Sequence, residues 1–527
     1  MTSRVPIPTD PLHQNEAEIP LSIEGGGEAV LPRPTSSAGL IDRLGWQSAG
    51  GLDLRWAAAG LAGLIVLCIA IQMAWPLATI SRHISLNNNE GWNAYWSTRA
   101  LAGQPIYTDA ASPLTNNYTP LSFYIVGWFG RAIGDLVLAG RIVSLVGLGG
   151  CSVLVGLIAA RFGRETGWGW AASAAFLLIA VTIAPRYIAA DDPQWLAAAL
   201  QMAGLWVLVQ RERLTAARIV GASLILLVAG LIKHNQVALP LAVTLALAIH
   251  NRRALAIWLG TGAALLVITL GALHALYGSA FVDQVLYHQR VLHLYYLGPA
   301  LSTVGFFVPA AAIAIAYIPR IRTWGRDPRL TMLALFAVLA TILGILERFG
   351  AGVSQNAHFD ALIAVMLLFG IVLVQGAHIR LSTATRLALM TLAIAPAAAK
   401  DLANLPRQAT AWREIDRTDE AWSDAIRYLA SRPGPIACER PALCYWAGKP
   451  YTLDFSNYGQ KLRRTGDPWH LRDRIARRQF AALVVIRDDR YRKHDARLPM
   501  EYYTLINANY RVERVLADKL YVMVPAG

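Results

Sequence analysis

Charged residues are scarce in this sequence. Only 16% of its 527 residues are Asp, Glu, Lys or Arg, and 55% are hydrophobic, whereas an ordinary soluble domain has about 25% charged residues. The hydrophobic residues are gathered in long runs, and the stretch 56–80 contains no charge at all. Because about 18 consecutive apolar residues are enough to cross a membrane as a helix, the sequence predicts an α-helical polytopic membrane protein.

Some familiar motifs are also missing. The chain has no GxGxxG or Walker motif and no CxxC pair, which argues against a nucleotide-binding loop and a zinc ribbon. Residues 1–50 contain no apolar run, so we expect no cleavable signal peptide. Of the four cysteines, Cys68 and Cys151 lie in apolar runs, whereas Cys438 and Cys444 lie in a polar C-terminal part. These two could form a disulfide if that part faces an oxidising compartment.

The positive charges have a regular placement along the chain. Arg residues cluster in short loops at 160–166, 211–218, 250–254, 319–329 and 378–386. Such loops mark the cytoplasmic side of a membrane protein, so the net charge of +14 does not indicate nucleic-acid binding. All five loops fall on one side when the apolar runs cross the membrane at 56–80, 136–160, 167–185, 193–210, 215–232, 235–249, 254–276, 301–319, 330–346, 359–376 and 385–399.

This topology predicts three parts. Residues 1–55, rich in Pro, Gly, Ser and Glu, form a disordered cytoplasmic tail, and residues 56–400 form the transmembrane domain. Its first outer loop, 81–135, holds at least two short helices, because the apolar stretch 119–130 is too short to span and suits the membrane interface. Residues 401–527 form a small extracytoplasmic α/β domain, with an amphipathic helix, a buried strand and a terminal hairpin.

Ionisable and polar residues at the ends of the apolar runs gather on the predicted outer side. Such residues are costly near the membrane interior, and they usually face a cavity or one another. Carboxylates can act as general bases, and cations can stabilise a phosphate. The mixture therefore favours an enzyme that works at the outer face. Its members are Glu90, Arg186, Asp191, Asp192, Lys233, His234, His288, Arg290, His293, Glu347, Arg348, Asn356, His358 and Asp360.

Several candidates also have an ordinary structural interpretation. Glu90 follows three Asn residues, has no evident ion-pair partner, and could simply favour the first turn of a helix. Asp191 and Asp192 precede a Pro and could cap the next helix. Lys233 could extend from a helix end to the interface, and Tyr118 could be an interfacial anchor.

An acidic residue after the first apolar run is followed by "YTPLSFYIVGWFG", "AGRIVS", "RYIAADDPQW", "IKHN" and "SQNAHFDAL". In this order they resemble the GT-C superfamily of membrane glycosyltransferases over about residues 56–400. They are similar to its protein O-mannosyltransferase, aminoarabinose-lipid A transferase and rhizobial lipid A galacturonosyltransferase branches. The resemblance implies a polyprenyl-phosphate-sugar donor, inversion at the anomeric carbon and an outward-facing site. These families often have Asp-Glu in the first loop, where this chain has Asn89-Glu90.

With this resemblance, we expect an inverting hexosyl- or pentosyltransferase of the bacterial inner membrane, with its active site and C-terminus outside. The acceptor is a lipid, a glycan or a protein, and membrane lipids surround the helices. We assign no metal site, although the carboxylates leave a divalent metal open. The catalytic candidates are Glu90, as general base, Asp191 and Asp192. The substrate-binding candidates are Asn89, Tyr118, Lys233, His234, Arg290, His293, Arg348, Asn356 and His358.

Two alternatives stay open. A transporter or lipid flippase would share the many spans, but it would place polar or broken segments at the bilayer midplane, whereas here the polar residues crowd one face. A second enzyme class, a polymer ligase that uses a diphosphate-linked glycan, would fit the same resemblance.

Overall fold

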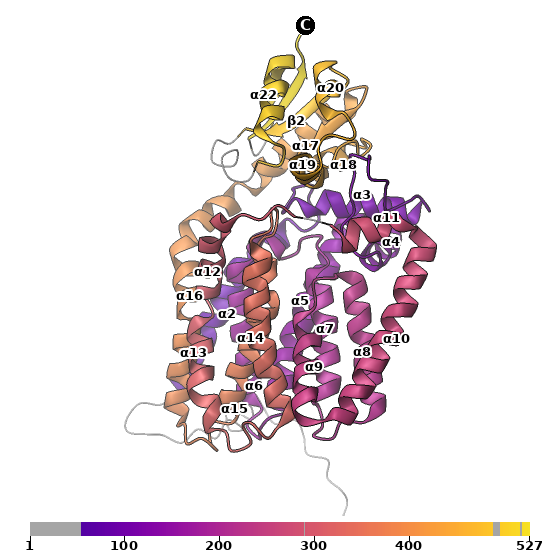
Figure 1. Ribbon diagram of the computed structural model, residues 1–527. Coiled ribbons are helices and arrows are strands. Elements are labelled where there is room, and N and C mark those ends of the chain that lie inside the picture. The colour runs from indigo at the N-terminus through magenta and orange to yellow at the C-terminus, as the bar shows by residue number, and fades with distance from the viewer. Residues whose placement is uncertain (1–53, 289, 488–495, 517–518) are drawn as a thin grey trace, which may run out of the picture. The chain divides into compact units, whose positions relative to one another are not determined.

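The computed structural model describes residues 54–288, 290–487, 496–516 and 519–527. The predicted tail, 1–55, lies outside the described residues except for its last two. Figure 1 shows the described residues as coloured ribbons.

An apolar helix occupies each stretch for which the sequence predicts a span. Among the described residues, five helices are long and apolar enough to cross a membrane, or six if the bent pair α12 and α13 is one span, so the predicted number of eleven is not confirmed. The remaining ones are shorter or more polar. Their bounds are α2 Leu54–Ala78, α5 Leu136–Ala160, α6 Gly167–Ile183, α7 Gln194–Val209, α8 Ala216–Ile232, α9 Ala238–His250, α10 Arg252–Tyr277, α12 Leu297–Gly305, α13 Val308–Tyr317, α14 Pro328–Arg348, α15 Phe359–Val374 and α16 Thr383–Arg413.

Helix α15 forms the centre of the bundle. All of its residues except Asp360 are buried, and it packs against α5, α6, α13 and α14. A helix that is hydrophobic all round belongs in such a place. Helix α16 runs beyond residue 400, where the sequence predicts the next domain, and leads directly into the C-terminal part.

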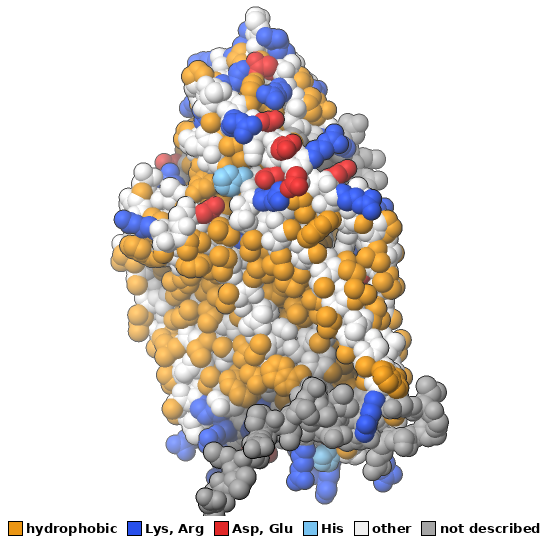
Figure 2. Space-filling model, turned by 180° about the vertical axis from the view of Figure 1, so that it is seen from behind, with side chains coloured by type: hydrophobic (Ala, Val, Ile, Leu, Met, Phe, Trp, Pro, Cys, Tyr) orange, Lys and Arg blue, Asp and Glu red, His pale blue; other side chains and the backbone are white. Residues whose placement is uncertain are grey.

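The Arg-rich loops meet at one end of the bundle. Arg329 lies 3.7 Å from the carboxylate of Glu212 and 5.1 Å from the ring centroid of Phe162, and Arg386 forms an ion pair with Glu165. These contacts join four of the five loops. Figure 2 shows a broad hydrophobic band between this end and the opposite one, where the acidic side chains visible in that view gather. The band is the part that a membrane would cover.

The segment between α2 and α5 contains two short helices, as the sequence predicts. Helix α3 spans Asn89–Leu101 and α4 spans Leu121–Ile133, and both lie at the end of the bundle below the C-terminal domain (Figure 1). The remaining short segments are η1 Pro185–Tyr187, α11 Ser279–Phe281, η2 Val282–Leu286, η3 Leu294–Tyr296, η4 Ile318–Arg320 and η5 Gln355–His358.

The C-terminal part is the predicted small α/β domain. Its four-stranded sheet has the order β1-β2-β4-β3, with β1 parallel to β2 and the other neighbours antiparallel. The predicted buried strand is β2 and the predicted hairpin is β3 and β4. The elements are α17 Ile415–Ser431, β1 Ile436–Cys438, α18 Pro441–Trp446, α19 Phe455–Arg464, α20 Leu471–Ala476, β2 Ala482–Ile486, α22 Met500–Asn509, β3 Tyr510–Val515 and β4 Leu520–Pro525.

A disulfide joins Cys438 to Cys444. It links the end of β1 to α18, and it confirms the pairing that the sequence left open. Cys68 and Cys151 are free and buried, as expected for cysteines that pack inside apolar helices.

Candidate active site

Glu90 is fully buried at the start of α3, and its partner is Arg141 of α5. The Arg141 Nε donates to Glu90 Oε1 at 2.8 Å and Nη2 donates to Oε2 at 3.2 Å. The backbone N–H groups of Leu86 and Asp191 also donate to the carboxylate, at 2.7 and 3.3 Å. The interpretation that Glu90 lacks an ion-pair partner is therefore wrong, and its oxygens already accept four hydrogen bonds.

Arg141 also binds the backbone at the start of the first loop. Besides Glu90, its guanidinium donates to the backbone oxygens of Thr79, Ile80, Arg82 and Ile84 at 2.6 to 3.1 Å. The sequence did not reveal this role because Arg141 lies inside an apolar run, although a lone Arg in such a run is itself an indication of a buried partner.

We expect Glu90→Gln to destabilise the protein by about 3–5 kcal/mol, because it leaves the Arg141 charge buried without its counter-ion. Thermal unfolding of the purified protein in detergent would measure this. Asp424→Asn is the matched control, since the Asp424–Arg427 ion pair is largely exposed and such pairs contribute about 0–1 kcal/mol. Equal melting temperatures for the two variants would contradict a structural role for the Glu90–Arg141 pair.

Four predicted residues from four separate segments meet close by, and we call Asn89, Tyr118, Asp192 and Lys233 the Asp192–Lys233 cluster. The Lys233 Nζ lies 3.8 Å from Asp192 Oδ1 and 3.6 Å from the ring centroid of Tyr118. The Asn89 Nδ2 donates to Asp192 Oδ2 at 2.7 Å and lies 3.5 Å from the Tyr118 hydroxyl. Asp192 and Lys233 are 2% and 4% exposed, so this ion pair is buried.

Burial lowers the pKa of Lys233, and the positive charge of Arg290 lowers it further. The negative charges of Asp192 and Glu347 offset only part of this lowering. An additional anion beside Lys233 would favour its charged form. The cluster thus holds one cation whose charge an incoming phosphate would stabilise.

Asp191 and Asp192, which the sequence could not tell apart, have different surroundings. The Asp191 carboxylate lies against α5, where a Cβ on Gly140 would come within 1.9 Å of Oδ1. Its Oδ2 has no hydrogen-bond partner among the described residues. Burial and the nearby charges of Glu90 and Asp192 raise its pKa well above the usual value. The Asp191 carboxylate therefore lies near Glu90, whereas the Asp192 carboxylate faces Lys233.

A short pairing of two loops positions Arg290. The His293 N–H donates to the Phe349 oxygen at 2.9 Å, and Leu292 and Gly350 form an antiparallel bridge. Arg290 Nη1 in turn donates to the Ala351 oxygen at 3.0 Å. Its positive charge acts to lower the pKa of both Tyr118 and Lys233.

The other candidates lie around the cluster rather than in it. His234 and His293 are exposed, and Arg348 lies 4.8 Å from the Tyr296 ring centroid. Asn356 accepts a hydrogen bond from the Tyr187 hydroxyl at 2.9 Å. His358 is fully buried. The structure thus brings Asn89, Tyr118, Asp192 and Lys233 together, whereas the Glu90 carboxylate lies outside this cluster, against Arg141.

The C-terminal domain docks directly onto α3. A Cβ on Gly91 would come within 2.0 Å of the Ala442 backbone nitrogen in α18, so the two helices touch through their backbones. The Trp92 Nε1 also donates to Asp454 Oδ2 at 3.0 Å. The helix that carries Asn89 is therefore held between the bundle and this domain.

No three His, Cys, Asp or Glu side chains within the described ranges are arranged to hold a metal ion. The two carboxylates nearest to Asn89 belong to different contacts, since Glu90 binds Arg141 and Asp192 faces Lys233.

The fold resembles solved membrane enzymes. ArnT from Cupriavidus metallidurans in the apo state matches with a TM-score of 0.57 at 14% identity, over 88% of this chain and 98% of that one. ArnT bound to undecaprenyl phosphate matches with 0.55 at 13% identity, over the same shares. The Archaeoglobus fulgidus oligosaccharyltransferase in the apo form matches with 0.51 at 11% identity, over 86% of this chain and 71% of that one.

These likenesses show that the chain shares the fold of ArnT and of the oligosaccharyltransferase. A comparison with protein-family models and one with curated proteins find no match.

Proposed function

We propose that this protein is a membrane glycosyltransferase that moves a sugar from a polyprenyl-phosphate carrier to a hydroxyl-bearing lipid, glycan or protein. The observation that carries the proposal is the buried Asp192–Lys233 pair, which combines a carboxylate that can accept a proton with a cation at the rim of the bundle. The likeness to ArnT bound to undecaprenyl phosphate supports the choice of donor.

The reaction assigns a task to each member of the cluster. The acceptor oxygen attacks the anomeric carbon while its proton passes to the Asp192 carboxylate. The bond between that carbon and the phosphate oxygen breaks, and polyprenyl phosphate leaves with one more negative charge. Lys233, together with Arg290, stabilises this growing charge. Attack opposite to the leaving group inverts the anomeric configuration.

Asp192 suits the role of base better than Glu90 does. The Glu90 oxygens accept from Arg141 and from two backbone N–H groups, whereas Asp192 faces the cation that would hold the donor. We assign Glu90 to positioning, since its ion pair fixes the helix on which Asn89 lies.

The test of the function is mass spectrometry of lipid-linked sugars and envelope glycans from cells with and without the gene. The expected result is one glycan or lipid that loses a sugar and one polyprenyl-phosphate sugar that accumulates when the gene is deleted. Transfer between the two should then be reproduced by the purified protein. Unchanged glycans together with a donor trapped on the cytoplasmic side would instead favour a flippase.

We further propose that the cluster and residues 401–527 face the outside of a bacterial inner membrane. The Arg-rich loops meet at the other end of the bundle, and such loops stay in the cytoplasm. Alkaline phosphatase fused at Gly527 should be active, and the same enzyme fused after Arg164 should be inactive. The reverse pattern would overturn this orientation.

A further inference from the structure

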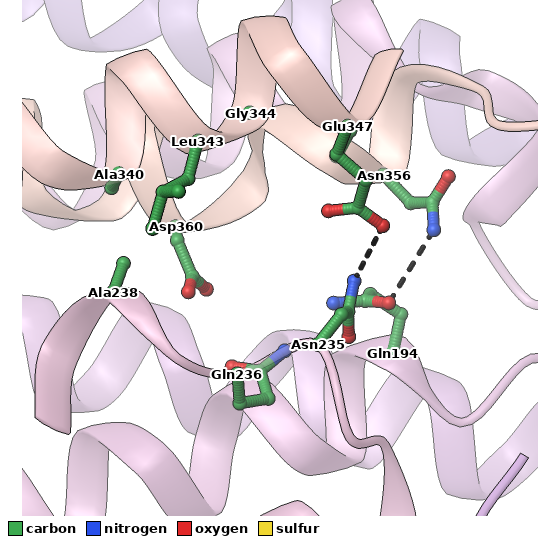
Figure 3. Close-up of a pocket in the computed structure, with 11 residues that line it drawn as sticks. Gln194, Asn235, Gln236, Ala238, Ala340, Leu343, Gly344, Glu347, Asn356 and Asp360 are labelled. Carbon is green, nitrogen blue, oxygen red and sulfur yellow. Dashed lines mark hydrogen bonds between the residues drawn. The ribbon is translucent and has the colours of Figure 1, made fainter. Parts of the chain in front are cut away.

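A polar cavity lies next to the Asp192–Lys233 cluster, between the ends of α7, α9, α14 and α15. Its volume is about 20 Å³, enough for about one water-sized group. Figure 3 shows Glu347 and Asn356 facing Asn235 and Gln194 across it. The six polar residues among its lining are Gln194, Asn235, Gln236, Glu347, Asn356 and Asp360.

Hydrogen-bond acceptors are left over in this cavity. Asn235 Oδ1, Gln236 Oε1 and Asp360 Oδ1 are buried and have no hydrogen-bond partner among the described residues. Among the fully buried side-chain atoms of the described lining, the one donor without a partner is Gln236 Nε2, and Gln236 is only 6% exposed. Buried polar atoms are rarely left unpaired. The missing partner is therefore a group that donates hydrogen bonds.

The charge of the cavity lining limits the kinds of chemical group that it can bind. Two carboxylates, Glu347 and Asp360, line it, and none of the described lining residues is Lys, Arg or His. Glu347 accepts from Asn235 Nδ2 at 3.0 Å and Asp360 from Gln201 Nε2 at 3.1 Å. Such a lining repels a phosphate or a carboxylate, and it accepts a hydroxyl or an ammonium group.

The cavity adjoins the place where the sugar of the donor would lie. Gln194 lines it and also donates its backbone N–H to Asp192 Oδ1 at 3.0 Å. Asn235 lies two residues after Lys233, and Glu347 acts on Lys233 by its charge. A sugar whose phosphate is at Lys233 and whose anomeric carbon is near Asp192 would therefore have a ring substituent within reach of this cavity.

We propose that the cavity binds one hydrogen-bond-donating substituent of the transferred sugar, a hydroxyl or an ammonium group, and so selects the sugar. The inference rests on the proposed function. A site built to accept a hydrogen bond rejects an analogue without the donor, because its own polar groups are then left unpaired.

The test measures binding by the purified full-length protein in nanodiscs. The probes are undecaprenyl phosphate alone and undecaprenyl phosphate linked to mannose, to arabinose or to 4-amino-4-deoxyarabinose. We expect at least one sugar-bearing probe to bind about tenfold or more tightly than the bare lipid. An advantage of the amino sugar over arabinose would identify an ammonium group, and equal affinities would identify a hydroxyl.

Two variants should abolish the higher affinity for the sugar-bearing probe without weakening the binding of bare undecaprenyl phosphate. Ala340→Val fills the cavity and removes no polar group, and Gln236→Leu removes two of the unpartnered atoms. Val338→Ala, on the exposed face of the same helix as Ala340, is the control and should change neither affinity.

Three results would overturn the inference. No sugar-bearing probe binds more tightly than the bare lipid, the higher affinity of a sugar-bearing probe survives both variants, or the variants lower the affinity for the bare lipid equally. Failure of undecaprenyl phosphate to bind the wild-type protein would instead overturn the proposed function.

Discussion

Replacing Asp192 by Asn is expected to lower kcat for sugar transfer by about 10²- to 10⁴-fold, the usual effect of losing a general base. Asn keeps the shape of the side chain but cannot take up the acceptor proton. Its single amide oxygen can accept from either Asn89 Nδ2 or the Gln194 N–H, whereas the two Asp192 oxygens accept from both. The measurement is single-turnover transfer by the purified protein, with the donor and acceptor that mass spectrometry identifies.

Asp191 and Glu90 provide the controls for this variant. Asp191→Asn leaves the Lys233 side unchanged, so we expect its kcat to stay within about tenfold of wild type. Glu90→Gln should lower the melting temperature, whereas the turnover of the molecules that remain folded should change much less than in Asp192→Asn. If Asp192→Asn stays active while Glu90→Gln is folded and inactive, then Glu90 is the base and our assignment of the two carboxylates is reversed.

Replacing Lys233 by Ala should lower kcat by about 10²-fold or more, comparable to the loss of an oxyanion-hole donor. Charge-assisted contacts are the stronger kind of hydrogen bond. The contact with the phosphate should tighten as that group leaves, so its loss slows turnover and does not merely weaken binding. Lys233→Arg should rescue only part of the rate, because a planar guanidinium does not replace a compact ammonium beside the Tyr118 ring.

A transport assay separates this prediction from the alternative function. The same undecaprenyl-phosphate sugar is placed in vesicles that contain the Lys233→Ala variant, and its movement between leaflets is followed. Loss of transfer with no effect on lipid movement is the expected outcome. If transfer is spared and movement stops, the protein is a flippase and the glycosyltransferase proposal falls.

Local patterns were sufficient for much of the fold. Long apolar runs gave the positions of the helices because a membrane requires both length and hydrophobicity. The number of spans was less predictable, since several apolar helices, such as α9 with 13 residues, are shorter than a full crossing. Alternating apolar residues and turn residues likewise predicted the terminal hairpin, because its contacts are between neighbours in the chain.

The candidate site was predictable only as a set of residue types. By itself the sequence determined that Asn89, Tyr118, Asp192 and Lys233 lie near helix ends on one side, because charge and hydropathy fix the depth of each residue in a membrane. Only the tertiary structure decided that Asp192 faces Lys233, whereas Glu90 turns to Arg141. The adjacent residues Asn89 and Glu90 point in different directions from the start of α3. The packing of α3 between α5 and α18 therefore determines that Asn89 reaches Asp192 and Glu90 reaches Arg141.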